Sequence, residues 1–332
     1  MPLRETMTDK TIKVLQEGEG KLIQPFDLEE FRAHNRARDK SLVDKRMTEA
    51  EAVTRFIQEG DYVAIELYGT VRCPMSLTRE VIRQGYKNLR TAGQGVYEAD
   101  LLGAADTFTE MDWTYIGLEV YGVSANLRRA VEGGYVKEVC EWSNAALAWR
   151  FKAAAMGVPF IPIRSMLGTD TLKYSAAKVI ECPFTGEPIC LIPALVVDCG
   201  MIHVNRADKY GNCQIDGIAG YAPELSGACK RLIISCEEIV DTEEIREAPD
   251  RTIIPWFQVD AVVHAPFGAH PGEMGRVYER DEQHIRDYFT SSRDPEQVKA
   301  YLDTWIHDVK DHQEYLDLVG REKLAGLRIE EV

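Results

Sequence analysis

The sequence predicts an α/β protein built on an open, mostly parallel sheet with flanking helices. In the first half, short apolar runs alternate with stretches of helical periodicity, and strand–helix–strand order is typical of parallel sheets. In the second half, three further apolar runs follow, two of them long enough to be buried on both faces. The predicted strands lie at 62–68, 89–92, 113–122, 194–204, 231–240 and 258–266.

Helix signals and turn residues fill the segments between these strands. Thr48 is a predicted N-cap with Glu51 three residues later, a capping box, and Gly60 is placed to close that helix. Further helices are predicted over 75–84 and 143–157, the second ending at Gly157. Extended structure at 159–163 and a hairpin at 179–193 with a P-F-T-G-E-P turn follow, and charged surface helices form the last 50 residues.

The chain divides into a polar extension, residues 1–46, and a larger domain, 47–332, on which the extension packs. It holds 39 Lys and Arg against 54 Asp and Glu, a net charge of −15, which argues against a nucleic-acid partner. No run approaches the roughly 18 apolar residues of a membrane span, and the start lacks a signal peptide, so we expect a cytoplasmic protein without a membrane partner. The eight cysteines form no C-x-x-C pair and are expected to be reduced core thiols.

Several enzyme classes are disfavoured because their motifs are missing. The sequence has no G-x-G-x-x-G after a strand, no G-x-x-x-x-G-K-[ST], no H-E-x-x-H and no G-x-S-x-G. The seven histidines show no tight ligand spacing, and His307 with His312 is better read as a solvated pair. We therefore predict neither a metal nor a tightly bound cofactor.

Polar residues and glycines gather where the predicted strands end, which is where open parallel sheets bind ligands. Glycines offer backbone amides, and Arg72 a fixed cation. Ser124 and Asn126 either cap a helix or face a substrate. Each group is also compatible with an ordinary turn. The candidates are Gly69, Thr70, Arg72, Gly93, Gln94, Gly95, Ser124 and Asn126.

Two carboxylates, Glu66 and Glu119, lie inside apolar runs, and His270 lies in the rigid loop A-P-F-G-A-H-P. A carboxylate in a dry cleft acquires a raised pKa and becomes a candidate base or nucleophile. Either glutamate can instead point to solvent or pair with an arginine, and the histidine loop can be a structural turn.

Taken in order and spacing, a set of short segments resembles the A (alpha) subunit of family I CoA-transferases, above all the glutaconate type. The similarity runs from about Met47 to about Arg328. The segments are M-T-E-A-E-A-V, G-D-Y-V-A-I, R-C-P before V-I-R-Q-G, A-A-A-M-G-V-P-F-I-P, V-D-C-G-M-I-H before A-D-K-Y-G-N, C-E-E-I-V-D-T-E-E-I, V-D-A-V-V-H-A-P-F-G-A-H-P and D-H-Q-E-Y-L.

This resemblance implies a NagB/RpiA/CoA-transferase-like fold, acyl-CoA and carboxylic acid as substrates, and a homologous partner, the beta subunit. In such enzymes the group that attacks the acyl-CoA is a glutamate of the beta subunit, so this chain alone should be inactive; the S-E-N-G signature of that glutamate is absent here. The resemblance assigns substrate contact to Arg72 and His270 and oxyanion stabilisation to Ser124. It therefore predicts that Arg72→Lys and Ser124→Ala lower activity with little change in melting temperature.

The chain departs from the family at Glu66 and Tyr68, which replace a Gly-Gly pair. A Glu66 paired with Arg72 would favour monocarboxylic or aromatic acyl groups, whereas a free, desolvated Glu66 would be a catalytic base. Related branches are ring-opening hydrolases, whose catalytic glutamate is replaced by Asn144 here, and decarboxylases. A non-catalytic scaffold subunit is the remaining alternative.

Overall fold

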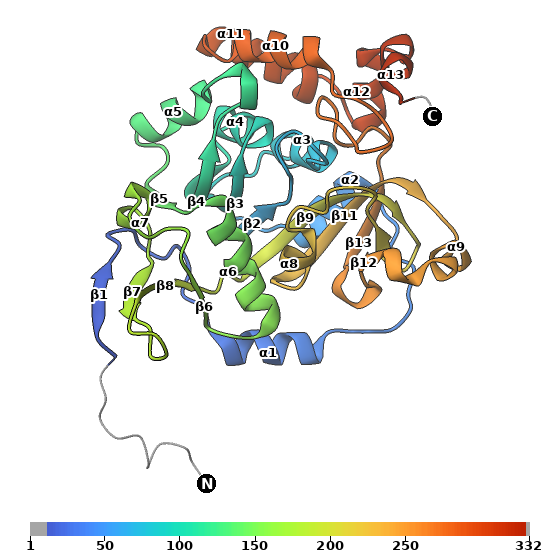
Figure 1. The fold of residues 1–332 in the computed structure, drawn as a ribbon. Coiled ribbons are helices and arrows are strands. Elements are labelled where there is room, and N and C mark those ends of the chain that lie inside the picture. The colour runs from blue at the N-terminus through green and yellow to red at the C-terminus, as the bar shows by residue number, and fades with distance from the viewer. Residues whose placement is uncertain (1–11, 330–332) are drawn as a thin grey trace.

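The computed structural model describes residues 12–329, and its centre is a nine-stranded sheet (Figure 1). Residues 1–11, the start of the predicted extension, and 330–332 lie outside the described residues. Seven strands form a parallel series in the order β13-β11-β9-β2-β3-β4-β5. In addition, β10 pairs antiparallel with β9, and β12 pairs antiparallel with β10. The predicted fold class is confirmed. The strands are β2 (Tyr62–Ile65), β3 (Leu89–Gly95), β4 (Phe108–Ile116), β5 (Glu138–Glu141), β9 (Val197–Ala207), β10 (Cys213–Gln214), β11 (Cys229–Ile239), β12 (Thr252–Ile254) and β13 (Ala261–His264).

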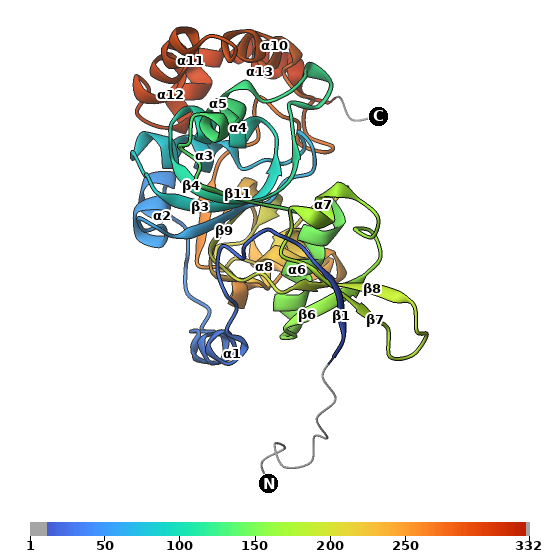
Figure 2. The same ribbon diagram turned by 90° about the vertical axis from the view of Figure 1, so that its left-hand side faces the viewer.

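Helices cover both faces of this sheet, as the side view shows (Figure 2). One face carries α2 (Glu49–Phe56), α3 (Met75–Arg83), α4 (Tyr97–Ala104) and α5 (Ala125–Glu132), with α10 (Glu282–Ser291), α11 (Pro295–Leu302), α12 (His312–Val319) and α13 (Arg321–Leu327) beyond them. The other face carries α6 (Asn144–Met156) and α8 (Ala222–Ser226). Two large apolar clusters fill the two interfaces. Shorter elements are α7 (Asp170–Lys173), α9 (Thr242–Glu247), the 3₁₀ turns 119–121, 249–251 and 256–258, and a π turn at 303–307.

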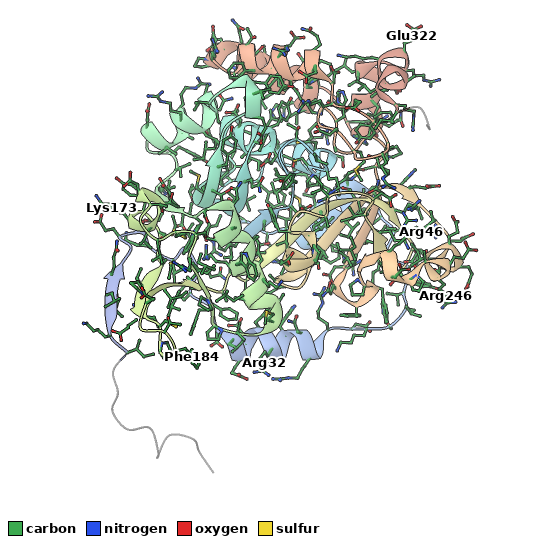
Figure 3. All side chains as sticks on the ribbon, viewed as in Figure 1. Arg32, Arg46, Lys173, Phe184, Arg246 and Glu322 are labelled. Atoms are coloured by element: carbon green, nitrogen blue, oxygen red, sulfur yellow. The ribbon has the colours of Figure 1, made fainter. Side chains whose placement is uncertain are left out.

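A second, four-stranded sheet lies beside the main one in the order β1-β7-β8-β6. The predicted hairpin forms it as β7 (Lys178–Glu181) and β8 (Pro188–Pro193), with Phe184 pointing outward from the tip (Figure 3). Strand β6 is Phe160–Ile163. From the N-terminal segment, β1 (Val14–Glu17) pairs with β7, and α1 (Leu28–Ala37) buries Phe31. The described part of the extension thus packs on the rest of the chain.

The predicted helix signals act as expected at α2 and α6. Thr48 and Glu51 form a capping box at the start of α2, although the helix ends at Phe56 and Gly60 lies in the following turn at φ +82°. Ser143 caps α6 by accepting a hydrogen bond from the Ala146 amide, and Gly157 ends it in the left-handed conformation. These local signals work because they satisfy backbone groups that the helix leaves unpaired.

The strand predicted over 113–122 is wrong in its position. Strand β4 begins at Phe108 and ends at Ile116, and the chain then leaves the sheet because the Leu118 amide bonds to the Gly122 carbonyl (2.7 Å) and closes a turn. Glu119 therefore sits in that turn, exposed, with φ +48°, and not inside a strand. The prediction carried the strand through Gly117 to Gly122 because apolar residues continue between these two glycines.

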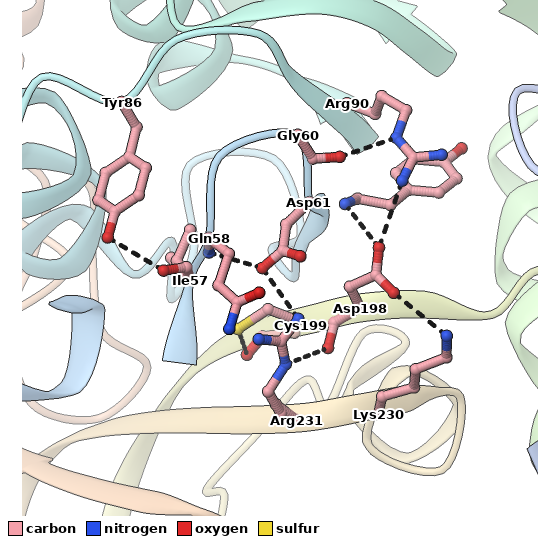
Figure 4. A network of polar contacts seen from close by, with 12 residues as sticks. Ile57, Gln58, Gly60, Asp61, Tyr86, Arg90, Asp198, Cys199, Lys230 and Arg231 are labelled. Atoms are coloured by element: carbon pink, nitrogen blue, oxygen red, sulfur yellow. Dashed lines mark hydrogen bonds and ion pairs between the residues drawn. The ribbon is translucent and has the colours of Figure 1, made fainter. Parts of the chain in front are cut away.

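Charged residues at the amino ends of the strands pair with one another (Figure 4). Asp198 accepts the Tyr62 amide (3.0 Å) and faces Arg90 (3.4 Å) and Lys230 (3.4 Å). Asp61 pairs with Arg231 at 2.9 Å. These pairs join β2, β3, β9 and β11 at their amino ends and so help to hold neighbouring strands in register.

Replacing Asp198 with Ala should lower the free energy of unfolding by about 1 to 3 kcal/mol, because two cations and a backbone amide lose their acceptor. Urea unfolding measures the change. The control is Glu132→Ala, which removes an exposed partner of Arg128 and should cost no more than about 0.5 kcal/mol. Equal effects from the two variants would contradict the structural role of this network.

All eight cysteines are unpaired, and seven of them are buried, which confirms the predicted core thiols. In the part of the chain that the structure describes, no helix is both long and apolar enough to span a bilayer.

Candidate functional site

Gly69, Gln94 and Glu119, which the sequence singled out, lie together at the carboxyl edge of the parallel sheet, where β2, β3 and β4 end. The Gly69 amide donates to Gln94 Oε1 over a long 3.4 Å, and a Cβ built on Gly69 would lie 3.3 Å from Glu119 Oε1. We call Gly69, Gln94 and Glu119 the edge cluster. At the end of β4, the Tyr115 amide donates to Oδ1 of Asn144 (3.3 Å), an exposed residue that begins α6. These groups are accessible or half-buried, as a substrate site requires.

The two other predicted glycines serve strand packing. A Cβ on Gly93 would lie 3.3 Å from the Ile65 carbonyl oxygen, and one on Gly95 would overlap the Trp113 ring at 2.2 Å. Both residues are buried within β3. Their lack of a side chain therefore lets neighbouring strands and a core tryptophan approach closely.

Glu66 and Arg72 form a two-pronged ion pair in which both side chains are fully buried. The two Arg72 terminal nitrogens donate to the Glu66 oxygens at 2.9 Å each. Two further donors bond to carbonyl oxygens, Nε to Ile218 (2.9 Å) and Nη1 also to His203 (3.1 Å). Burial raises the pKa of Glu66, and the Arg72 guanidinium opposes that rise. The pairing of Glu66 with Arg72 is the first of the two arrangements expected from the sequence.

An exposed glycine, Gly220, covers this pair. Its φ is +56°, and a Cβ there would lie 2.2 Å from Glu66 Oε1. The ion pair is therefore separated from the surface by one backbone segment. Four of the five Arg72 N–H groups are engaged inside the protein, which argues against the expectation that its guanidinium meets a substrate carboxylate.

Ser124 and Asn126 are interior residues that hold the start of α5. The Ser124 hydroxyl accepts the Leu127 amide (3.4 Å) and donates to Asp100, and Asn126 Nδ2 donates to the same carboxylate (2.7 Å). Tyr288 also donates to Asp100. Both residues are nearly inaccessible. The capping alternative thus describes Ser124, and its enclosed hydroxyl argues against the expected oxyanion contact.

His270 is also enclosed, which argues against its expected contact with substrate. Its Nδ1 lies 2.7 Å from the Tyr315 hydroxyl and its Nε2 lies 3.2 Å from Asp281. The loop that follows supports the turn between β2 and α3: the Arg72 amide donates to the Glu273 carbonyl (2.9 Å), and a Cβ on Gly272 would lie 2.1 Å from the Thr70 carbonyl oxygen. Thr70 itself is buried. The loop acts on the edge cluster through this turn.

Sequence reasoning missed a cluster of His270, Asp281 and His284, whose ligand-type atoms lie within 4.8 Å of one another. Only the short D-x-x-H spacing of the last two signals it, because the first residue comes from another loop. The Lys323 ammonium lies 2.6 Å from Asp281 and neutralises that carboxylate. Hydrogen bonds to His270 and Lys323 hold the pKa of Asp281 far below its usual range, although burial opposes them. A dication at this cluster would have to compete with the ammonium for that carboxylate.

Acid should destabilise the protein below about pH 6.5, because burial lowers the pKa of His284 and of His312 to about 3. Above pH 6.5 both states bind no proton at these rings. As the pH falls, the unfolded state takes up protons that the folded state excludes, so stability is lost. Each ring should cost on the order of 1 to 2 kcal/mol at pH 5.

Melting temperatures between pH 7.5 and 5 measure this loss. His312→Gln should flatten the profile, because glutamine can still donate to the Pro266 carbonyl that His312 Nε2 contacts at 2.8 Å. The control His307→Asn changes an exposed ring and should leave the slope unchanged. Profiles of equal slope for wild type and His312→Gln would contradict the prediction.

The fold and the edge cluster define an α/β chain whose accessible polar groups lie at the carboxyl ends of parallel strands. The family model for coenzyme A transferase matches residues 46–265. The chain therefore belongs to the coenzyme A transferase family.

Individual relatives cover most of the chain. A protein of Archaeoglobus fulgidus is 49% identical over 94% of this chain and 70% of its own length. The A (alpha) subunit of 3-oxoadipate CoA-transferase from Pseudomonas knackmussii is 36% identical over 83% of this chain and 99% of its own. The A (alpha) subunit of glutaconate CoA-transferase from Acidaminococcus fermentans is 31% identical over 86% and 95%. The crystal structure of glutaconate CoA-transferase from that organism superimposes with a TM-score of 0.82, covering 86% of this chain and 96% of that one at 30% identity.

Proposed function

We propose that this chain is the alpha subunit of a heteromeric CoA-transferase that moves CoA between an acyl-CoA and a carboxylic acid. The observation that carries the proposal is the match to the alpha subunits of two named CoA-transferases over more than four fifths of the chain. A homologous beta subunit would supply the nucleophilic glutamate, consistent with the absence of S-E-N-G from this sequence.

The reaction divides into covalent half-reactions. The partner's glutamate carboxylate attacks the thioester carbonyl and expels CoA thiolate, which gives a mixed anhydride. The thiolate then attacks the glutamyl carbonyl and releases the first acid, which leaves a glutamyl-CoA thioester. The acceptor carboxylate reverses these steps and departs as the new acyl-CoA. Coenzyme A is thus carried as a substrate.

This chain would contribute binding groups at the edge cluster. The hydrogen bond from the Gly69 amide to Gln94 is long, so this amide can also donate to a substrate oxygen. Gln94 and Asn144 would add neutral polar contacts. Glu66, Arg72, Ser124, Asn126 and His270 would hold the surrounding turns in place. Thr70, Gly93 and Gly95 would fix the close backbone approach on which the edge cluster depends.

The partner would cover the carboxyl edge. Large apolar side chains remain exposed after β2, at the end of β4 and just beyond it, and on the segment that covers the ion pair: Tyr68, Tyr115, Ile116, Val120, Val123 and Ile218. Exposed apolar side chains gathered in this way are typical of protein interfaces. Unpaired thiols are compatible with a reducing compartment, and we propose the cytoplasm.

Co-expression with the beta-type subunit should yield a mixed complex that transfers CoA, whereas this chain alone should show no transfer. Acyl-CoA formed from a second acid, followed by chromatography, measures the reaction. Gln94→Ala and Asn144→Ala should lower turnover in the intact complex. An active lone chain would contradict the proposal, and release of free CoA without any acceptor would favour the hydrolase alternative. Full activity in both variants would favour a scaffold role.

A further inference from the structure

We infer that the enzyme uses acyl groups without a second carboxylate and that Glu119 enforces this choice. The inference rests on the proposed function and names its substrate class. It concerns the specificity of the edge cluster, where Glu119 Oε1 lies 3.3 Å from the position that a Cβ on Gly69 would take.

Glu119 is held at that place by the fold. Its left-handed backbone, at φ +48°, is strained for a residue with a side chain and persists only where surrounding contacts impose it. Two residues on, the Tyr121 hydroxyl donates to Glu282 Oε2 at 2.6 Å. A Cβ on Gly122 would lie 2.7 Å from the Phe289 ring, so the turn is packed against α10. The turn that carries Glu119 is therefore held in place beside Gly69.

No cation neutralises this carboxylate: Glu119 has no ion pair within residues 12–329. The arginines of the adjoining segments already face other carboxylates. Arg72 is closed on Glu66. Arg280, whose Nη1 is 3.4 Å from the Thr70 hydroxyl, pairs with Glu282 at 2.8 Å. Arg286 also faces Glu282, at 3.5 Å.

Charge and surface at the edge cluster together disfavour a dicarboxylic acid. One carboxylate of the substrate must approach the reacting centre, and a second, distal one would face Glu119 without a free arginine to bind it. Like charges placed together at an interface discriminate strongly against the wrong partner. Tyr68 (50% exposed) and Tyr115 (41% exposed) border both the edge cluster and the proposed partner interface, so an acyl group bound between the two subunits would meet aromatic side chains. This surface suits a neutral aliphatic or aromatic acyl group.

The test uses the assembled complex with a panel of acceptors: butyrate and benzoate as neutral-tailed acids, glutarate and adipate as dicarboxylates. We expect wild type to prefer the neutral-tailed acids by at least about tenfold in kcat/KM. Glu119→Gln keeps the side-chain shape and removes the charge, and it should lower this preference about tenfold, mainly through a smaller KM for the dicarboxylates. Added salt should weaken the wild-type preference, because it screens exposed charges.

Glu132→Gln, an exposed carboxylate on α5, is the matched control and should leave the preference unchanged. A wild-type preference for dicarboxylates, or an unchanged preference in Glu119→Gln, would overturn the inference while leaving CoA transfer intact. Equal loss of turnover with every acid would show that Glu119 acts in the reaction itself and would overturn its role in selection. No transfer to any acid by an assembled complex would refute the proposed function and, with it, this inference.

Discussion

Glu66→Ala should lower the free energy of unfolding by about 3 to 5 kcal/mol, since it leaves the Arg72 guanidinium buried without its carboxylate. Both side chains are inaccessible, and the pair takes two of the contacts that the arginine makes. Urea denaturation of the chain, or of the complex, gives the measurement. The same reasoning corrects the expectation for Arg72→Lys, because a single ammonium cannot replace four hydrogen bonds in a planar fork.

A double variant distinguishes the cost of leaving a buried charge unpaired from the cost of lost packing. Glu66→Leu with Arg72→Met removes both charges together and should recover much of the loss, since an apolar pair can replace a buried ion pair at little cost. A single variant that loses less than about 1 kcal/mol would show that water reaches the pair. That outcome would make Arg72 available to a substrate after all.

Gly272→Ala should lower both stability and CoA transfer, because its methyl group would lie 2.1 Å from the Thr70 carbonyl oxygen. Backbone atoms cannot yield as a flexible side chain does, so the loop after His270 or the turn carrying Gly69 must shift. A displacement of about 1 Å at a substrate-positioning turn can cost on the order of a hundredfold in turnover. Steady-state transfer rates and thermal unfolding of the complex measure the two effects.

Gly326→Ala is the matched control, because Gly326 lies within α13 and a Cβ there meets nothing within 4 Å. Alanine favours a helix over glycine by up to about 1 kcal/mol, so this variant should be unchanged or slightly more stable. If Gly272→Ala behaves as Gly326→Ala does, the loop does not support the turn.

Much of the fold could be predicted because its signals are local. Thr48 and Glu51 cap a helix through backbone groups three residues apart, and Gly157 ends α6 through its own φ. The parallel order followed from alternating strands and helices. The boundary near Glu119 could not be predicted in this way, because it depends on Leu118 bonding to Gly122 and on Phe289, far along the chain, packing against that turn.

For the candidate site, the sequence indicated which edge of the sheet carries polar residues, but not which of those side chains are accessible. The predicted strand ends placed Gly69 and Gln94 at one edge of the sheet, and the two residues are in contact there. Burial is a property of distant neighbours, so the sequence did not show that Asp100 encloses Ser124 or that Tyr315 and Asp281 enclose His270. It did raise the possibility of a Glu66–Arg72 pair, because a carboxylate in an apolar strand needs a partner.

The position of β9 affects how the chain can fold. This strand lies between β2 and β11, so Val63 of an early strand pairs with Cys199, which is made much later. Until β9 arrives, β2 presents an open edge of backbone donors and acceptors, which is a template for pairing with other chains. Sheets that depend on such distant pairings form slowly. During synthesis this chain should therefore be sensitive to aggregation until residues 197–207 have left the ribosome, and slower translation before that point should reduce its yield.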